Sequence, residues 1–214
     1  MIENAKENSQ RVELKDRIIE TASEAFTAHG IKSITMDDIA ASLGISKRTL
    51  YEVFQDKESL LTQCILKRQE EMNAFLAETL ANSKNVLEVI LVCYQRSIET
   101  FHLTNKRFFE DIKKYPKVHS LLKNYRERDS DSTIEFFKMG IKQGIFRDDV
   151  NFAIVNLLVH EQLDLLMNTD ICNKYSFLEV YEAIMFTYIR GISTEKGAKV
   201  LEDFITEYRK QRIH

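Results

Sequence analysis

The chain has 214 residues, enough for one ordinary domain or two small ones with a substantial buried core. Its 30 Lys and Arg stand against 33 Asp and Glu, and this net charge of −3 excludes a protein whose whole surface binds polyanions. With one proline and six glycines, little interrupts helices, so the composition predicts an all-α fold.

The three cysteines, Cys64, Cys93 and Cys172, are widely separated and form no CxxC or Cys/His cluster. This spacing argues against a structural zinc site and favours buried thiols in a reducing compartment, with a redox sensor as the alternative. We expect neither a metal nor a cofactor. Residues 1–12 are polar and lack the apolar centre of a signal peptide, and no apolar run approaches the about 18 residues of a membrane span. Residues 1–12 are expected to form a mobile arm, and the protein is expected to be cytoplasmic.

The first predicted helix covers Lys15 to His29. Its apolar residues recur at helical spacing and form one stripe: Ile18, Ile19, Ala22, Ala25 and Phe26. Gly30 follows directly and is expected to end this helix.

Residues 35–54 are typical of two short amphipathic helices joined by a tight turn. Ile39, Ala40 and Leu43 share a buried face, and Gly44 is suited to end the first helix because glycine tolerates a positive φ. Ser46 can cap the second helix. Ile45, Leu50 and Phe54 are expected to pack inward, which leaves five residues facing outward: Lys47, Arg48, Thr49, Tyr51 and Glu52.

This layout is that of a helix-turn-helix, which places its second helix in the DNA major groove. The alternative from the pattern alone is an ordinary helical hairpin whose Lys47 and Arg48 are merely solvated. A long helix beginning near Asp56 follows the motif.

The combined pattern is a helix, Gly-Ile, Thr-Met-x-x-Ile-Ala, Gly-Ile-Ser-x-x-Thr-Leu-Tyr-x-x-Phe and x-x-Lys-Glu-x-Leu-Leu. It closely resembles the N-terminal domain of TetR-family transcriptional regulators over about residues 15–62. The resemblance implies phosphate contacts by Thr35, by Lys57 and through the Tyr51 hydroxyl, with a set that enters the major groove: Lys47, Arg48 and Thr49. Arg48 is the best candidate to bind a guanine. The alternatives are a helix cap for Thr35 and a half-buried core position for Tyr51.

Positions 52 and 53 depart from the family, because Glu and Val stand where many members carry His or an aromatic residue. Glu52 can accept from a cytosine amine, or it can simply be solvated. An operator sequence therefore cannot be carried over from relatives. Residues 1–60 hold 8 Lys or Arg against 11 Asp or Glu, so the positive charge must be local, and it lies on six residues: Arg11, Lys15, Arg17, Lys47, Arg48 and Lys57.

After residue 60 the pattern is helical almost throughout, and about nine to ten helices are expected in all. The predicted ranges are 57–81, 86–103, 105–115, 116–143, 151–168, 176–191 and 195–211. The predicted domains are a helix-turn-helix domain over 13–60 and an effector-binding and dimerisation domain over 61–214. The C-terminal tail also resembles the family, and this implies a homodimer through helices at about 176–192 and 195–211. Their apolar stripes are also compatible with an ordinary core.

In relatives the middle helices hold a small-molecule pocket. Candidate pocket residues here are Tyr94, Phe101, Phe109, Tyr125, Phe137 and His160, and their alternative is plain core. They would suit a small apolar or aromatic effector.

The sequence thus predicts a DNA-binding transcriptional regulator, in particular a ligand-responsive repressor that binds a palindromic double-stranded DNA operator as a homodimer. The sequence contains no catalytic motif of a known enzyme class, and we expect no enzymatic activity. The alternative is a TetR-like protein with an architectural or protein-partner role and no effector, and repressor versus activator stays open.

Overall fold

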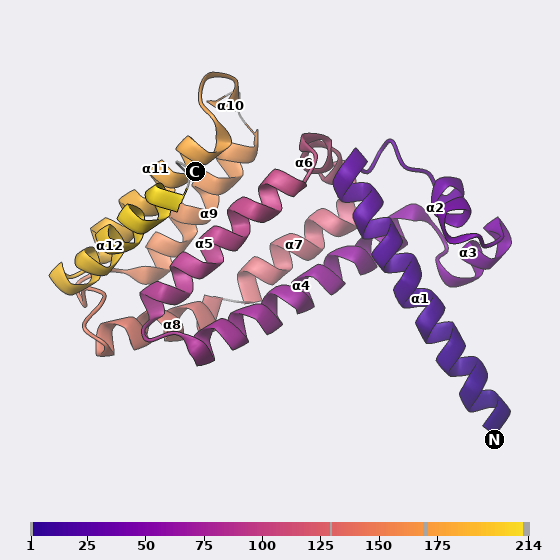
Figure 1. Cartoon of the computed structure of the whole chain (residues 1–214), viewed down its shortest axis with the longest axis horizontal. Coiled ribbons are helices and arrows are strands. Elements are labelled where there is room, and N and C mark those ends of the chain that lie inside the picture. The colour runs from indigo at the N-terminus through magenta and orange to yellow at the C-terminus, as the bar shows by residue number, and fades with distance from the viewer. Residues whose placement is uncertain (1, 129, 169–170, 212–214) are drawn as a thin grey trace. The chain divides into compact units, whose positions relative to one another are not determined.

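The computed structural model describes residues 2–128, 130–168 and 171–211 (Figure 1). These residues are almost entirely helical, as predicted, and Phe146 and Ser193 form an isolated antiparallel bridge. The helices are α1 (Ile2–His29), α2 (Met36–Leu43), α3 (Lys47–Val53), α4 (Lys57–Asn82), α5 (Val86–Leu103), α6 (Lys106–Ile112), α7 (Pro116–Arg128), α8 (Ser130–Lys142), α9 (Phe152–Asn168), α10 (Ile171–Lys174), α11 (Phe177–Ile192) and α12 (Glu195–Gln211).

The chain divides into two compact units. Unit 1 comprises residues 1–75 and 99–125, and unit 2 comprises residues 76–98 and 126–214. The end of α5, α6 and most of α7 therefore group with the helices of the helix-turn-helix. This division does not follow the domain boundary that the sequence placed at residue 60.

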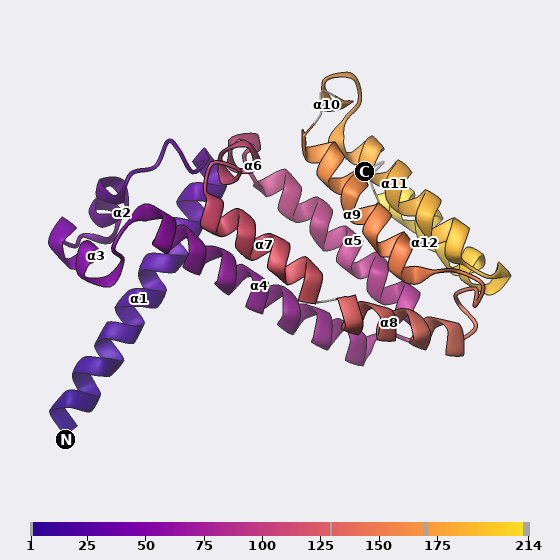
Figure 2. The same ribbon diagram turned by 180° about the vertical axis from the view of Figure 1, so that it is seen from behind.

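α1 differs from its predicted bounds. α1 begins at Ile2 instead of Lys15, and its N-terminal part extends away from α2 and α3 in both ribbon views (Figures 1 and 2). No Gly or Pro before residue 30 stops this helix. The mobility predicted for residues 1–12 stays a prediction.

The helix predicted over 116–143 corresponds to α7, which extends to Arg128, and to α8, which begins at Ser130. Residue 129 itself lies outside the described residues.

The core of unit 1 joins α1, α2, α3, α4, α6 and α7. Phe26, Ile31 and Leu50 are completely buried in it, and Phe108 and Val118 from the later part of the chain pack on the same cluster. The core of unit 2 is built mainly from α5, α11 and α12, with Ile145 and Phe146 of the α8–α9 connector. Tyr94 of α5 is its largest fully buried side chain.

Unit 2 also contains a close contact between α8 and this connector. Gly140 lies in α8 where a Cβ atom would come within 2.2 Å of the Phe146 ring and 2.8 Å of Val86 Cγ2. Both neighbours are fully buried, so neither can move aside. A glycine is therefore required at this helical position for steric reasons.

We predict that Gly140→Ala lowers the free energy of unfolding by about 1–3 kcal/mol, because it overpacks a filled core. Gly191→Ala is the matched control, since Gly191 is also helical but a Cβ atom there would meet no other atom within 4 Å. This control should gain up to about 1 kcal/mol from helix propensity. Urea unfolding followed by circular dichroism measures both, and equal effects of the two substitutions would contradict the steric role.

Candidate DNA-binding surface

Local capping fixes the turn between α2 and α3. Gly44 has a φ of +65° and its N–H donates to Ala41 O at 3.1 Å, while Ile45 N–H donates to Ala40 O at 3.0 Å. Ser46 then caps α3, because its Oγ accepts from Thr49 N–H at 3.0 Å. The predicted turn and cap are confirmed, and together they set the direction in which α3 leaves α2.

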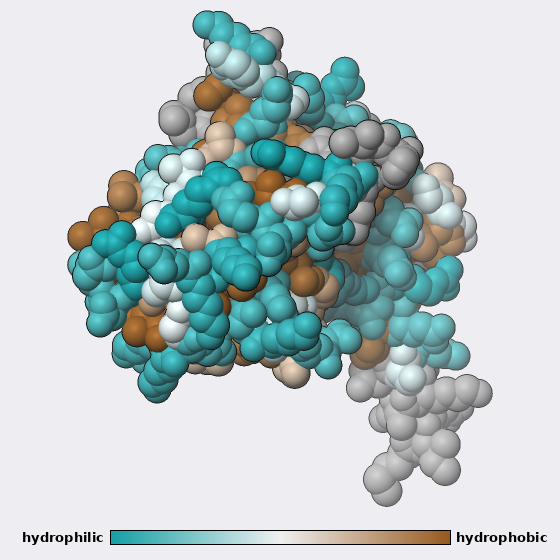
Figure 3. All heavy atoms as spheres, turned by 60° about the vertical axis from the view of Figure 1, so that its left-hand side comes forward, coloured by the Kyte–Doolittle hydropathy of each residue, from teal (hydrophilic) through white to brown (hydrophobic). Residues whose placement is uncertain are grey.

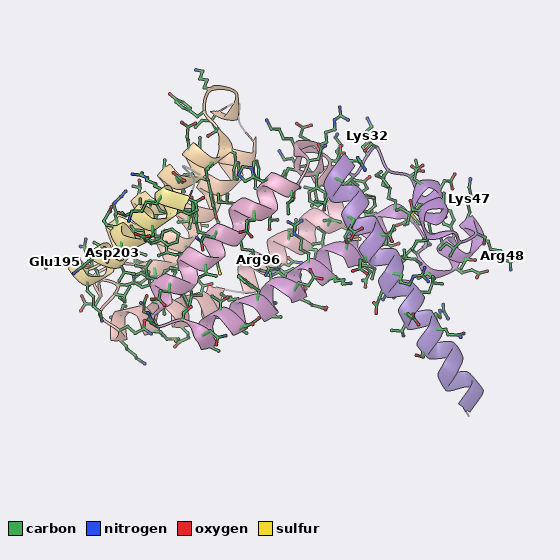
Figure 4. The ribbon with its side chains drawn as sticks, in the orientation of Figure 1. Lys32, Lys47, Arg48, Arg96, Glu195 and Asp203 are labelled. Carbon is green, nitrogen blue, oxygen red and sulfur yellow. The ribbon has the colours of Figure 1, made fainter. Side chains whose placement is uncertain are left out.

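α3 separates an inner from an outer face. Leu50 is fully buried, and Phe54, which follows the helix, is 4% exposed. Lys47, Arg48 and Glu52 are exposed, as is Tyr51, while Thr49 is half-buried. About half of Tyr51 is exposed (49%), and its phosphate contact stays a prediction. Lys47 and Arg48 lie at the outer edge of the α2–α3 pair, away from α1 (Figure 4).

Both cations at the start of α3 are already paired with carboxylates. The Lys47 ammonium donates to Asp37 of α2, and Arg48 Nε donates to Glu52 Oε1 at 2.9 Å, one turn further along α3. The hydrogen bond with Asp37 raises the pKa of Lys47 above its usual value. Exposed pairs of this kind contribute little stability, so a DNA phosphate can replace Asp37 as the partner of Lys47 at small cost.

Thr35 is the N-cap of α2. Its hydroxyl oxygen accepts from Asp38 N–H at 3.1 Å and its own backbone N–H donates to Asp38 Oδ2 at 2.8 Å, which forms a capping box. The side-chain and backbone hydrogen bonds from Thr35 lower the pKa of Asp38. The cap expected for Thr35 is confirmed. Its side chain is also exposed, and its phosphate contact stays a prediction.

The Lys57 ammonium is turned toward the protein. It donates to the carbonyl oxygens of Ile31 and Ile34 in the loop between α1 and α2, and it lies 5.6 Å from the centre of the Phe26 ring. Burial lowers the pKa of Lys57, against the opposing effect of the Asp111 and Asp38 charges. In this geometry Lys57 stabilises the loop, and a phosphate contact requires its side chain to leave both carbonyls.

Asp111 of α6 is a positioning residue that no sequence pattern singles out. Its side chain is buried, Oδ2 accepts from Lys32 N–H at 2.7 Å, and Oδ1 pairs with Lys114 at 3.0 Å. Burial alone would raise the pKa of Asp111, but the Lys32 and Lys114 contacts lower it on balance. No local pattern could link Asp111 to a backbone group 79 residues away.

α6 also contacts the end of α1 through Asn105, whose N–H donates to Thr27 O at 2.8 Å and whose amide donates to Ala28 O at 3.1 Å. Gly30 lies beneath α6 with a φ of +85°, and a Cβ there would meet Arg107 Cβ at 2.7 Å. Lys32 is exposed beside this contact and is a further cation on the same unit (Figure 4).

Comparison with known proteins agrees with this geometry. Residues 18–64 match the family model described as bacterial regulatory proteins, tetR family. The N-terminal part of the chain is therefore similar to the DNA-binding part of tetR-family regulators. Two HTH-type transcriptional regulators of Staphylococcus aureus are among the proteins to which the chain is similar. The one from strain bovine RF122 / ET3-1 is 37% identical over 78 residues, which cover 36% of this chain and 37% of that protein. The one from strain USA300 is 38% identical over 76 residues, 36% of each chain.

The similarity to these curated relatives thus spans little more than a third of their length. They are named as regulators of transcription and not as enzymes, in agreement with the expectation from the sequence.

Solved structures extend the agreement in fold over most of the chain. A TetR-family transcriptional regulator from Cytophaga hutchinsonii superposes with a TM-score of 0.68 at 15% identity, covering 87% of this chain and 98% of that one. A putative transcriptional regulator from Saccharomonospora viridis, in complex with choline, gives a TM-score of 0.67 at 18% identity and covers 86% and 100%. At these identities the agreement concerns the fold alone.

The six candidate pocket residues fall in both units. In unit 1, Phe101 stacks on Phe109 with ring centres 5.7 Å apart, and Tyr125 is half-buried. In unit 2, Tyr94 stacks on Tyr181 at 5.4 Å and Phe137 on Phe152 at 4.5 Å, while His160 is half-buried. Four of the six thus pack against other rings of the chain, and the pocket stays a prediction.

The described part of the chain contains neither a membrane-spanning helix nor a metal-binding cluster. No described helix is both long and apolar enough to cross a membrane. Among the described residues, no group of three or more His, Cys, Asp or Glu is placed to hold a metal ion.

We predict that Lys57→Met lowers the free energy of unfolding by about 1–3 kcal/mol, because the loop carbonyls lose a charged donor. Methionine keeps the apolar stem over Phe26, so the loss reports on the ammonium. Lys47→Met is the control, since its ammonium contacts only an exposed carboxylate and its removal should leave stability nearly unchanged. Thermal and urea unfolding measure both. A Lys57→Met protein as stable as the wild type would refute the structural role of this ammonium.

Proposed function

We propose that this chain is a DNA-binding transcriptional regulator that inserts α3 into the major groove. The observation that carries the proposal is the outer face of α3, where Lys47, Arg48 and Tyr51 are exposed while Leu50 anchors the helix to the core of unit 1. A short helix held rigidly from behind, with cations and hydrogen-bonding groups in front, suits contact with base edges.

The charge balance supports specific recognition over general affinity for nucleic acid. The first 60 residues are net acidic, so few phosphates can be neutralised and non-specific binding should be weak. Discrimination then depends on a few local groups on α3, with Thr35 and Tyr51 as proposed backbone contacts. Lys57 joins them only if its ammonium is released from the loop.

We further propose that the protein acts as a homodimer on a palindromic operator. One short recognition helix contacts few bases, and a two-fold axis doubles these contacts on a symmetric site. We infer that α9 contributes to the dimer surface, because this helix has exposed apolar residues. Ile154, Leu157 and Leu158 lie on one side of this helix and are 54%, 59% and 45% exposed.

α12 is less suited to this surface than its sequence suggested. Leu201 and Ile205 are buried in the core of unit 2, and the remaining apolar residues of its stripe pack on the same core: Val200, Phe204 and Tyr208. Its other side is charged, with Glu195 and Asp203 at the outer edge of the helix (Figure 4).

Hydrophilic residues predominate in Figure 3, and hydrophobic ones form separate patches. α11, which packs along α9, adds two exposed small residues at one-turn spacing that would allow close helix approach, Ala183 and Thr187. We therefore propose α9 with α11 as the dimer surface.

For control, we propose a ligand-responsive repressor whose effector is a small apolar or aromatic molecule held among the aromatic residues after α4. The support is the resemblance to the family and the number of rings in this part of the chain. An effector acts only through its different affinities for the DNA-binding and non-binding conformations. The stacked rings favour the alternative, a regulator without an effector. An operator affinity that no apolar or aromatic compound changes would decide for that alternative.

We predict that Arg48→Ala lowers affinity for a selected operator by about 5- to 100-fold and relaxes the preference at one base pair, because a guanine contact is lost. Arg147→Ala is the matched control, since Arg147 is also exposed and paired with a carboxylate, Asp149, but lies in unit 2. Fluorescence anisotropy with duplexes selected by the wild type measures both variants. Equal losses for Arg48→Ala and Arg147→Ala would contradict the assignment of α3.

We predict that Leu157→Glu converts the dimer to a monomer, because it buries a charge at the centre of the proposed α9 surface. Operator affinity should fall with it, while the helical content stays that of the wild type. Leu103→Glu is the control, since Leu103 is 76% exposed and belongs to unit 1. Sedimentation velocity gives the masses, and a Leu157→Glu protein that remains dimeric would refute the α9 surface.

A further inference from the structure

The ion pair between Arg48 and Glu52 lies entirely on the outer face of α3. Arg48 Nε donates to Glu52 Oε1 at 2.9 Å, and the two side chains are 89% and 60% exposed. Arg48 and Glu52 are one helical turn apart and contact each other on the outer face of α3. The proposed function places the DNA bases against this face. We refer to Arg48 and Glu52 as the recognition pair.

The geometry of the pair leaves its best DNA-binding groups available. Glu52 engages the Nε side of the guanidinium. Among the described residues, no partner is found for the two terminal nitrogens of Arg48, whose parallel N–H groups match O6 and N7 of guanine. Glu52 thus holds the Arg48 side chain in one orientation without blocking this fork. A side chain held in place loses less conformational entropy on binding.

Resting on the proposed function, we propose that the recognition pair selects a guanine followed by a cytosine at the neighbouring base pair. Arg48 binds the guanine, and Glu52 accepts a hydrogen bond from the cytosine N4 amine. Glu52 is then a specificity-determining residue.

The chemistry of a carboxylate restricts the neighbouring base. An ionised Glu52 can only accept hydrogen bonds. In the major groove thymine presents the O4 acceptor and guanine the O6 and N7 acceptors, so both repel it. Adenine presents an amine beside its N7 acceptor, whereas cytosine presents the amine without an adjacent acceptor. Cytosine is therefore the base that best satisfies Glu52.

The spacing agrees with neighbouring base pairs. Four residues of α-helix rise about 6 Å, and successive base pairs are about 3.4 Å apart, so two long side chains that lean toward each other can reach adjacent pairs. The bond between Arg48 and Glu52 shows that these side chains do lean toward each other.

The ion pair between Lys47 and Asp37 differs from the recognition pair in the position of its carboxylate. Its carboxylate belongs to Asp37 on α2, not on the helix proposed to enter the groove. Asp37 therefore changes the local charge, as Glu52 does, without a position from which to contact a base. A variant at each site separates a charge effect from recognition of a base.

The test is selection of binding sites from randomised duplex DNA by wild type, Glu52→Gln and Asp37→Asn. The wild type should select guanine next to cytosine in each half-site. Glu52→Gln should replace this cytosine by adenine, because glutamine binds N6 and N7 of adenine together, with a change in preference of about tenfold. Asp37→Asn should bind all sequences more tightly and keep the wild-type preference. Circular dichroism of each variant checks that its overall helical content equals that of the wild type.

Two results would overturn the inference. A Glu52→Gln protein that keeps the cytosine preference would show that Glu52 does not contact this base pair. A uniform gain in affinity, equal to that of Asp37→Asn, would reduce Glu52 to a charge effect. In both results the wild type still selects a site, so the proposed function stands. A folded wild type that selects no sequence would instead refute the proposed function, and the recognition pair with it.

Discussion

The position of α3 depends on the short loop between α1 and α2, whose backbone is held from two helices that follow it in the sequence. Lys57 of α4 donates to the carbonyls of Ile31 and Ile34, and Asp111 of α6 accepts from Lys32 N–H. A cation thus satisfies the acceptors of this loop while an anion satisfies a donor. Because α2 begins directly after the loop, this fixed backbone orients α2, and the Gly44 turn passes the orientation to α3.

This arrangement assigns the charges of unit 1 to two different tasks. The charges of Lys57 and Asp111 are withdrawn from solvent and hold the backbone, whereas Lys47 and Arg48 remain exposed and reversibly paired. Exposed pairs are easily exchanged for phosphates or bases, while loss of a buried partner leaves a polar group unsatisfied. A net acidic domain can therefore keep both a rigid frame and a small cationic surface, since its acidic residues also set the resting positions of the cations.

Features that depend on neighbouring residues could be predicted from the sequence. Gly44, Ser46 and the inward spacing of Leu50 and Phe54 act within one or two turns, and the structure contains them as expected. Features that depend on contacts between residues far apart in the sequence could not be predicted. Lys57 has the sequence position of a phosphate ligand, but the loop carbonyls attract its ammonium in the folded chain. The stripe of α12 has the pattern of an interface, yet periodicity alone cannot tell whether its partner is the same chain or a second copy.

α4 gives the two units a covalent connection. It begins at Lys57 in unit 1 and continues past residue 76 into unit 2, so the residue that holds the α1–α2 loop belongs to a helix that both units share. Under the proposed effector control, an effector that changes the conformation of α4 need not reach the DNA-binding surface to weaken it. A conformation of α4 that draws the Lys57 ammonium away from Ile31 and Ile34 would loosen the loop and, with it, the orientation of α2 and α3. This change can draw only on the difference in effector binding free energy between the two conformations. That difference must exceed the free energy that the Lys57 hydrogen bonds contribute.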